Sequence, residues 1–148
     1  MTETMTFLDR KPGLYLKDTG FRSRGVFCVT AIIAGEELET TPAIILNEKE
    51  NHHTDETILR EYVFKIGKLS KEIRRQANVK VVKDSSCVVM GVASFCNHDE
   101  QPNAEVVWEE KDGTLYYVLR STNDIPADTE ICTSYGENWF GNRDIELK

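Results

Sequence analysis

Short apolar runs separated by polar turns recur along the whole chain. Such runs predict strands, because most are too short for a helix and are rich in β-branched and aromatic residues. The strand candidates are residues 14–16, 26–33, 37–45, 62–66, 79–82, 86–91, 104–110, 115–121 and 130–135. Residues 70–78 have the pattern of an exposed helix, whereas 47–56 and 95–103 are polar and predict loops. Since strands and helices do not alternate, the pattern predicts a mostly-β fold.

Two features predict how the strands are joined. Asp112 and Gly113 stand between the runs at 104–110 and 115–121, and an Asp-Gly pair there predicts a tight β-hairpin. Residues 32–38 and 125–131 share the pattern Ile-x-Ala-x-x-Glu-aliphatic. We interpret the two copies as one turn used twice, each time at the start of a strand, since two copies do not indicate a repeat protein.

The length of 148 residues predicts one domain, residues 1–148, with a core from about 14 to 140. No apolar run approaches the ~20 residues that a membrane helix needs. The first residues also lack the basic and apolar regions of a secretory signal. We therefore expect an intracellular protein, cytoplasmic or nuclear, or one acting inside a host cell if it is an effector.

The charge and the cysteines narrow the classes of ligand. The net charge is -7, and no basic run is longer than Arg74-Arg75, so we expect no direct nucleic-acid binding and no membrane contact. An acidic surface favours a basic partner, although acidity also serves solubility. The four cysteines are widely spaced without a CxxC pair, which predicts buried free thiols and no metal site.

Polar or aromatic residues form three islands among the apolar strands, at residues 23–27 (SRGVF), 94–103 (SFCNHDEQPN) and 133–136 (TSYG). The chain contains no nucleophile elbow, Walker loop or HExxH motif. Taken alone, the middle island also fits a turn stabilised by Asx side chains. From the residues alone, the middle island could be either a functional site or a structural turn.

Together the islands resemble a known family. NHDEQPN, preceded by the apolar GVASF, resembles the Asn-His-x-x-x-Pro-Asn signature of SET-domain lysine methyltransferases. SRGVF resembles that family's Gly-x-Gly-Val-Phe loop, EYVFKI its Tyr-x-Phe strand, and DIPADTEICTSYG its C-terminal motif. The order matches over about residues 14–140, as in compact bacterial and viral members without zinc-binding flanks. The resemblance implies a β-clip of several small sheets with short helices and a C-terminal pseudoknot-like segment.

The resemblance also implies S-adenosylmethionine as cofactor and a lysine of a protein, such as a basic histone-like tail, as substrate. The catalytic residue would be Tyr135, beside a lysine channel that includes Tyr62 and Thr133. The residues that would contact the cofactor are Arg24, Gly25, Val26, Tyr62, Asn97, His98, Trp139 and Phe140.

Several positions depart from the family's pattern. Ser23 replaces the first Gly of Gly-x-Gly, Ser94 stands where many members have Arg, and Asp128 replaces a turn Gly. Asp99 and Glu100 follow the His where Ser-Cys is common, and Thr133 leaves the number of methyl groups open. Two rival functions therefore stay open: a SET-like module that holds a basic peptide without catalysis, and a β-rich assembly domain. The sequence does not decide whether the protein forms a homodimer.

Overall fold

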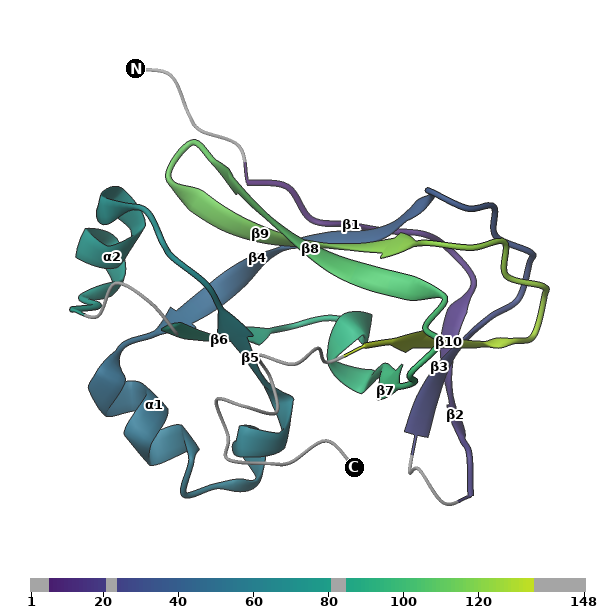
Figure 1. The fold of residues 1–148 in the computed structure, drawn as a ribbon, viewed down its shortest axis with the longest axis horizontal. Helices are drawn as coiled ribbons and strands as arrows, with labels where there is room; N and C mark the ends of the chain where they lie inside the picture. Colours follow the sequence, from purple (N-terminus) through teal and green to yellow (C-terminus); the bar gives the residue numbers. More distant parts are fainter. Residues whose placement is uncertain (1–5, 21–23, 81–84, 135–148) are drawn as a thin grey trace.

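A computed structural model describes residues 6–20, 24–80 and 85–134, and the statements that follow concern these residues. They form two β-sheets with short helices at one end of the larger sheet (Figure 1). The mostly-β fold predicted from the sequence is confirmed. Neither helix of this part of the chain is long and apolar enough to span a membrane.

The larger sheet has six strands in the order β5-β6-β4-β9-β8, and β1 pairs with β4 beside this path. All of its strand pairs are antiparallel. Its strands are β1 (Asp9–Arg10), β4 (Glu37–Leu46), β5 (Val63–Ile66), β6 (Ser85–Val89), β8 (Ala104–Lys111) and β9 (Thr114–Ser121). In the turn between β8 and β9, Asp112 and Gly113 both have positive φ, 51° and 75°, as the predicted Asp-Gly hairpin turn requires.

The smaller sheet has four strands in the order β2-β3-β10-β7. Its strands are β2 (Leu14–Asp18), β3 (Arg24–Cys28), β7 (Asn97–His98) and β10 (Glu130–Thr133). β10 runs antiparallel to β3 but parallel to β7, with Cys132 opposite Asn97 and Thr133 opposite His98. The parallel pair brings two of the three sequence islands side by side.

The repeated turn is confirmed, and its two copies pair with each other. Ile32 and Ile125 exchange two backbone hydrogen bonds of 2.8 Å, and both side chains are buried. Three residues later, Gly35 and Asp128 both adopt a left-handed conformation, with φ of 83° and 58°. Asp tolerates this conformation better than most residues, which explains how Asp128 replaces a glycine there.

The helical predictions are partly right. The helix expected at 70–78 is α2 (Lys71–Ala77), which Ser70 caps through the backbone N–H of Ile73, and which ends at Asn78 in the left-handed conformation. Residues 47–56, expected as a loop, instead contain α1 (Glu48–Thr54). Asn47 and Glu50 form a capping box at its start, a local signal that apolar periodicity does not reveal.

Several strand predictions extend too far, among them the strand expected at 86–91, which ends at Val89. The strand expected at 26–33 ends at Cys28, because the chain there turns to accept a hydrogen bond from Asp128. Residues 79 and 80 carry no strand, and 81–82 lie outside the described residues. The strand expected at 62–66 begins at residue 63, after a short 3-10 helix, η1 (Ile58–Tyr62). A second such helix, η2 (Val92–Phe95), follows β6.

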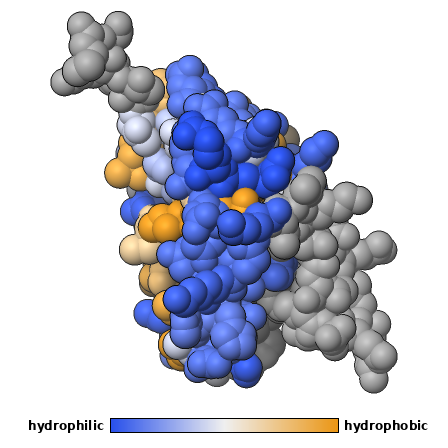
Figure 2. All heavy atoms as spheres, turned by 90° about the vertical axis from the view of Figure 1, so that its left-hand side faces the viewer, coloured by the Kyte–Doolittle hydropathy of each residue, from blue (hydrophilic) through white to orange (hydrophobic). Residues whose placement is uncertain are grey.

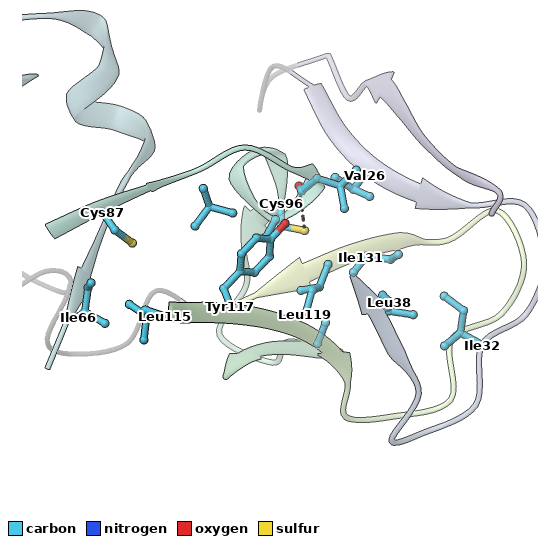
Figure 3. Packing of buried hydrophobic residues seen from close by; sticks show 14 of the residues in the cluster. Val26, Ile32, Leu38, Ile66, Cys87, Cys96, Leu115, Tyr117, Leu119 and Ile131 are labelled. Atoms are coloured by element: carbon cyan, nitrogen blue, oxygen red, sulfur yellow. Dashed lines mark hydrogen bonds between the residues drawn. The ribbon is translucent and has the colours of Figure 1, made fainter. Parts of the chain in front are cut away.

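A buried polar group lies within the apolar core. Tyr117 is fully buried, and its ring lies among the core residues that Figure 3 labels. Near its hydroxyl group lies the carboxylate of Glu39, a residue that is only 2% exposed. That carboxylate accepts hydrogen bonds from the backbone N–H groups of Val92 and Ala93 and from Arg10 Nε. A buried charge needs such partners, so Glu39 fixes the start of η2 against β4.

Gly91 leaves room for this arrangement. In Gly91→Ala, the added methyl group would overlap the Tyr117 hydroxyl and a Glu39 carboxylate oxygen. We expect the free energy of unfolding, measured by chemical denaturation, to fall by about 1–3 kcal/mol. The backbone at Gly91 is extended, with φ of -165°, so overlap is the only source of the loss.

Gly67→Ala is the matched control, because no atom lies within 4 Å of the added methyl group, and it should cost nothing measurable. In a Tyr117→Phe background one of the overlapping atoms is gone, so part of the Gly91→Ala loss should be recovered. The explanation fails if the loss is the same in both backgrounds.

Candidate functional site

A cavity of about 780 Å³ opens between β2, β3, η1 and η2. Its volume falls in the range of small-molecule sites in proteins. The wall is mainly apolar and aromatic, with Arg10, Arg24 and Ser94 as its polar members. The apolar and aromatic lining comprises Leu14, Tyr15, Leu16, Ile58, Leu59, Tyr62, Val88, Val89, Met90, Val92 and Phe95.

Three side chains from distant parts of the sequence meet at this cavity. The rings of Tyr62 and Phe95 lie edge to face, with centroids 6.0 Å apart and an interplanar angle of 62°. The guanidinium carbon of Arg24 lies 5.1 Å from the centroid of the Phe95 ring. Phe95 therefore links Arg24 at the start of β3 to Tyr62 at the end of η1. Such a wall offers aromatic faces and one cation to a ligand.

Two contacts hold η2, and hence Phe95, in place. At its N-terminal end, Glu39 binds the backbone of Val92 and Ala93. The hydroxyl group of Ser94 donates a hydrogen bond of 2.5 Å to the carbonyl oxygen of Val89. Glu39 shapes the site although it belongs to none of the sequence motifs. No local signal identifies it. In a strand that mixes polar and apolar residues, the sequence does not show whether a Glu side chain is buried or exposed to solvent.

Asn97 joins three strands beside the cavity. Its side-chain nitrogen donates a hydrogen bond of 2.7 Å to Glu130 Oε2 in β10 and a longer one of 3.4 Å to the carbonyl oxygen of Arg24 in β3. A Cβ atom on Gly25 would overlap the Glu130 carboxylate and lie 3.1 Å from Asn97 Nδ2. Gly25 is thus needed for space, not for an unusual backbone conformation.

Asn103 fixes the other end of the NHDEQPN loop to β10. Its side chain accepts from the backbone N–H of Cys132 and donates to the carbonyl oxygen of Glu130, both at 2.9 Å. Asp99 accepts the backbone N–H of Gln101 at 2.9 Å, which is the Asx turn that the sequence also allowed. Side-chain hydrogen bonds therefore hold the loop against β10, from Asn97 before the turn and from Asn103 after it.

The residues expected from the sequence differ in where they lie relative to the cavity. Arg24 and Tyr62 line the cavity, and Asn97 adjoins it through the backbone of Arg24. Val26 is fully buried in the core, so only its backbone is available to a ligand, and Thr133 is also buried. His98 is half-buried and stands opposite Thr133 in the parallel strand pair. Tyr135, Trp139 and Phe140 lie outside the described residues.

The cysteines are buried and free, as expected from their spacing and apolar neighbours. Burial raises the pKa of Cys96 and of Cys87 far above that of an ordinary thiol, so both are neutral near pH 7. Since the thiolate is the nucleophilic form, these two residues are structural.

Comparison with known proteins identifies the family. Residues 23–136 match the sequence profile of the SET domain, which spans most of the chain. The chain belongs to the SET-domain family. The enzyme class expected from the sequence, a protein-lysine methyltransferase, is confirmed at the level of this family.

One relative and two solved structures show what this SET-domain chain is similar to. A histone-lysine N-methyltransferase of Schizosaccharomyces pombe, specific for H3 lysine-37, is 29% identical over 131 residues, which is 86% of this chain and 76% of the relative. A Plasmodium falciparum protein assigned as a histone methyltransferase has a TM-score of 0.65 at 22% identity, covering 88% of this chain and 98% of its own. A Neurospora SET domain protein, a histone lysine methyltransferase, has a TM-score of 0.63 at 21% identity. The match covers 86% of this chain and 54% of the Neurospora chain. At identities of 22% and 21%, the similarity to the two structures shows that this chain has the same fold.

The contact between Gly25 and the Asn97–Glu130 pair can be tested through stability. Gly25→Ala forces its methyl group onto the Glu130 carboxylate, so we expect the hydrogen bond to break and the melting temperature to fall, with a loss of about 1–3 kcal/mol. Gly67→Ala again serves as the control, because its methyl group meets open space. Equal melting temperatures for the two variants would show that β3 does not pack this closely on β7 and β10.

Proposed function

We propose that the protein transfers a methyl group from S-adenosylmethionine to a lysine side chain of a protein, at the cavity between β3, η1 and η2. One observation carries this proposal: Arg24, Tyr62 and Phe95 converge on a single cavity from three segments that match separate family motifs. Asn97, which belongs to the same motif as Phe95, donates a hydrogen bond to the backbone carbonyl oxygen of Arg24. The convergence favours a ligand site over a chance similarity.

The cavity fits the proposed cofactor in size and chemistry. S-adenosylmethionine has a flat adenine ring, a positively charged sulfonium and an amino-acid end. The faces of Tyr62 and Phe95 suit the ring and the sulfonium, because aromatic faces attract cations and stack on flat groups. Arg24 suits a carboxylate, and it forms no ion pair with any described residue. When bound, the cofactor supplies an electrophilic methyl group.

The protein's part in the reaction is to deliver the lysine as a neutral amine. From a reference pKa near 10.4, removing the proton at pH 7 costs about 4.6 kcal/mol. Burial between aromatic rings disfavours the charged form and lowers this cost. Tyr62 supplies one such ring, and the resemblance assigns a second to Tyr135. Alignment of the amine with the methyl group contributes further to the rate.

A basic histone-like protein is the proposed substrate. The Schizosaccharomyces pombe relative and the Neurospora protein are histone lysine methyltransferases, and the Plasmodium protein is assigned as one. The net charge of -7 favours a lysine-rich partner by long-range attraction. A histone substrate would place the protein in the nucleus.

Cofactor binding is tested by calorimetric titration of the purified protein with S-adenosylmethionine. Saturable one-to-one binding is expected, and Asn97→Ala should weaken it. However, Asn97 also holds β7 to β10, so its loss could act through the fold alone. Glu130→Ala is the matched variant, because it breaks the same hydrogen bond while leaving the Asn97 amide in place.

A direct role for Asn97 predicts that Asn97→Ala loses far more affinity than Glu130→Ala, with both variants folded by circular dichroism. If the two lose affinity equally, Asn97 is a structural residue. Absence of binding by the folded native chain, with and without a histone peptide, would favour the non-catalytic peptide-binding module.

Tyr135 is tested by methyl transfer to recombinant histones. Tyr135→Phe removes only the hydroxyl group that would orient the amine, so turnover should fall by about a hundredfold or more while cofactor affinity stays nearly unchanged. Tyr116→Phe is a control, because Tyr116 lies in β9, outside the lining of the cavity. Normal turnover by Tyr135→Phe would remove Tyr135 from the proposed mechanism.

A further inference from the structure

Positive charge is concentrated in one short segment of this acidic chain. Residues 65–80 hold six of the 18 Lys and Arg residues but only one of the 25 Asp and Glu residues, which leaves 12 cations and 24 anions for the rest of the chain. The segment is therefore strongly basic within a protein of net charge -7. The cations are spaced apart, so no basic run is longer than Arg74-Arg75, and the expectation of no direct nucleic-acid binding, which rested on run length and net charge, did not consider this segment.

Helix α2 and the residues that flank it carry five of these six cations. Ile73 is buried and anchors the helix to the core. Lys71 and Arg75 are exposed and stand one helical turn apart, so they share the outward side of the helix. We call this surface the α2 basic face. Its members are Lys68, Lys71, Arg74, Arg75 and Lys80, all exposed except the half-buried Arg74.

The ion pairs within the described part of the chain leave the cations of this face unpaired. Among residues 6–20, 24–80 and 85–134, every ion pair involves other cations. Two acids close to the face, Glu48 and Glu72, accept hydrogen bonds from uncharged amide groups. Glu72 accepts from Gln76 on the side of α2 that faces Gly113, and Glu48 accepts the backbone N–H of Lys80 at 2.7 Å. The face therefore presents free positive charge to a partner.

The surroundings of the face indicate the chemistry of that partner. None of the exposed large hydrophobic side chains lies between residues 65 and 80, and the segment has no aromatic residue. Figure 2 shows the end of the molecule that carries α1 and α2 as mainly hydrophilic, with hydrophobic residues along one edge. Protein interfaces and membrane-inserting helices use apolar anchors, and single-stranded nucleic acids stack on aromatic rings. A duplex bound through its phosphates needs neither.

We propose that the α2 basic face is a second binding surface, for the phosphate backbone of double-stranded DNA. The choice of DNA rests on the proposed function, because DNA accompanies histones as their polyanion. Binding is independent of base sequence, since the face offers charge without a group that reads bases. Figure 1 places α2 at the opposite end of the ribbon from β2 and β3, so the two surfaces can be occupied together.

Fluorescence anisotropy of the full chain with a labelled DNA duplex of mixed sequence, over a series of KCl concentrations, tests the proposal. Five phosphate contacts predict that log K falls with log salt with a slope of about -4 to -5. Arg75→Glu should weaken binding and make the slope shallower by about one. Lys17→Glu carries the same change in net charge on an exposed residue of β2, and it should bind as the native chain does.

Three outcomes would overturn the proposal: no DNA binding at low salt, equal weakening by Arg75→Glu and Lys17→Glu, or equal binding to anionic lipid vesicles with the same sensitivity to Arg75→Glu. Circular dichroism confirms that each variant is folded. Methyl transfer to a free histone peptide should be unchanged in Arg75→Glu. The two proposals therefore fail separately, because the DNA assay contains no cofactor and the peptide assay contains no DNA.

Discussion

The structure around the cavity depends on the attachment of β10 between two strands that are distant in sequence. β10 pairs antiparallel with β3 and parallel with β7. β7 has two residues, too few for its backbone bonds alone to fix it, so the side chains of Asn97 and Asn103 complete the pairing. The absence of a side chain at Gly25 lets β3 approach the pair. These contacts bring the three polar islands of the sequence together.

A family signature in this chain thus has two roles. Asn97 and Asn103 belong to the segment that most resembles a SET methyltransferase, and both form hydrogen bonds that hold strands together. Glu39 has a related function from outside every motif, because its buried carboxylate sets the position of η2. The cavity therefore depends on residues that shape it from outside as well as on those that face it. A motif match alone does not separate the two kinds.

The net charge of the chain and the distribution of charge on its surface favour different partners. The net charge of -7 favours a basic substrate, while α2 collects free cations at one end of the molecule. Long-range attraction depends on the sum of the charges, whereas contact with a polyanion depends on which side chains share a face. The proposed histone substrate and the proposed DNA contact therefore depend on different features of the same charge distribution.

The sequence by itself determined the mostly-β class, the hairpin at Asp112-Gly113, the helix at 70–78 and the turn used twice, because each depends on local periodicity or turn chemistry. It also determined the family, since four motifs in the same order are specific together. It did not show the helix α1, because the capping residues Asn47 and Glu50 lie in a segment without apolar periodicity. Only the tertiary structure decided that Arg24, Tyr62 and Phe95 share one cavity and that the two repeated turns pair through Ile32 and Ile125. It also placed the Glu39 carboxylate in the core. These contacts join residues far apart in the chain, and their energies depend on burial and distance, which no local pattern encodes.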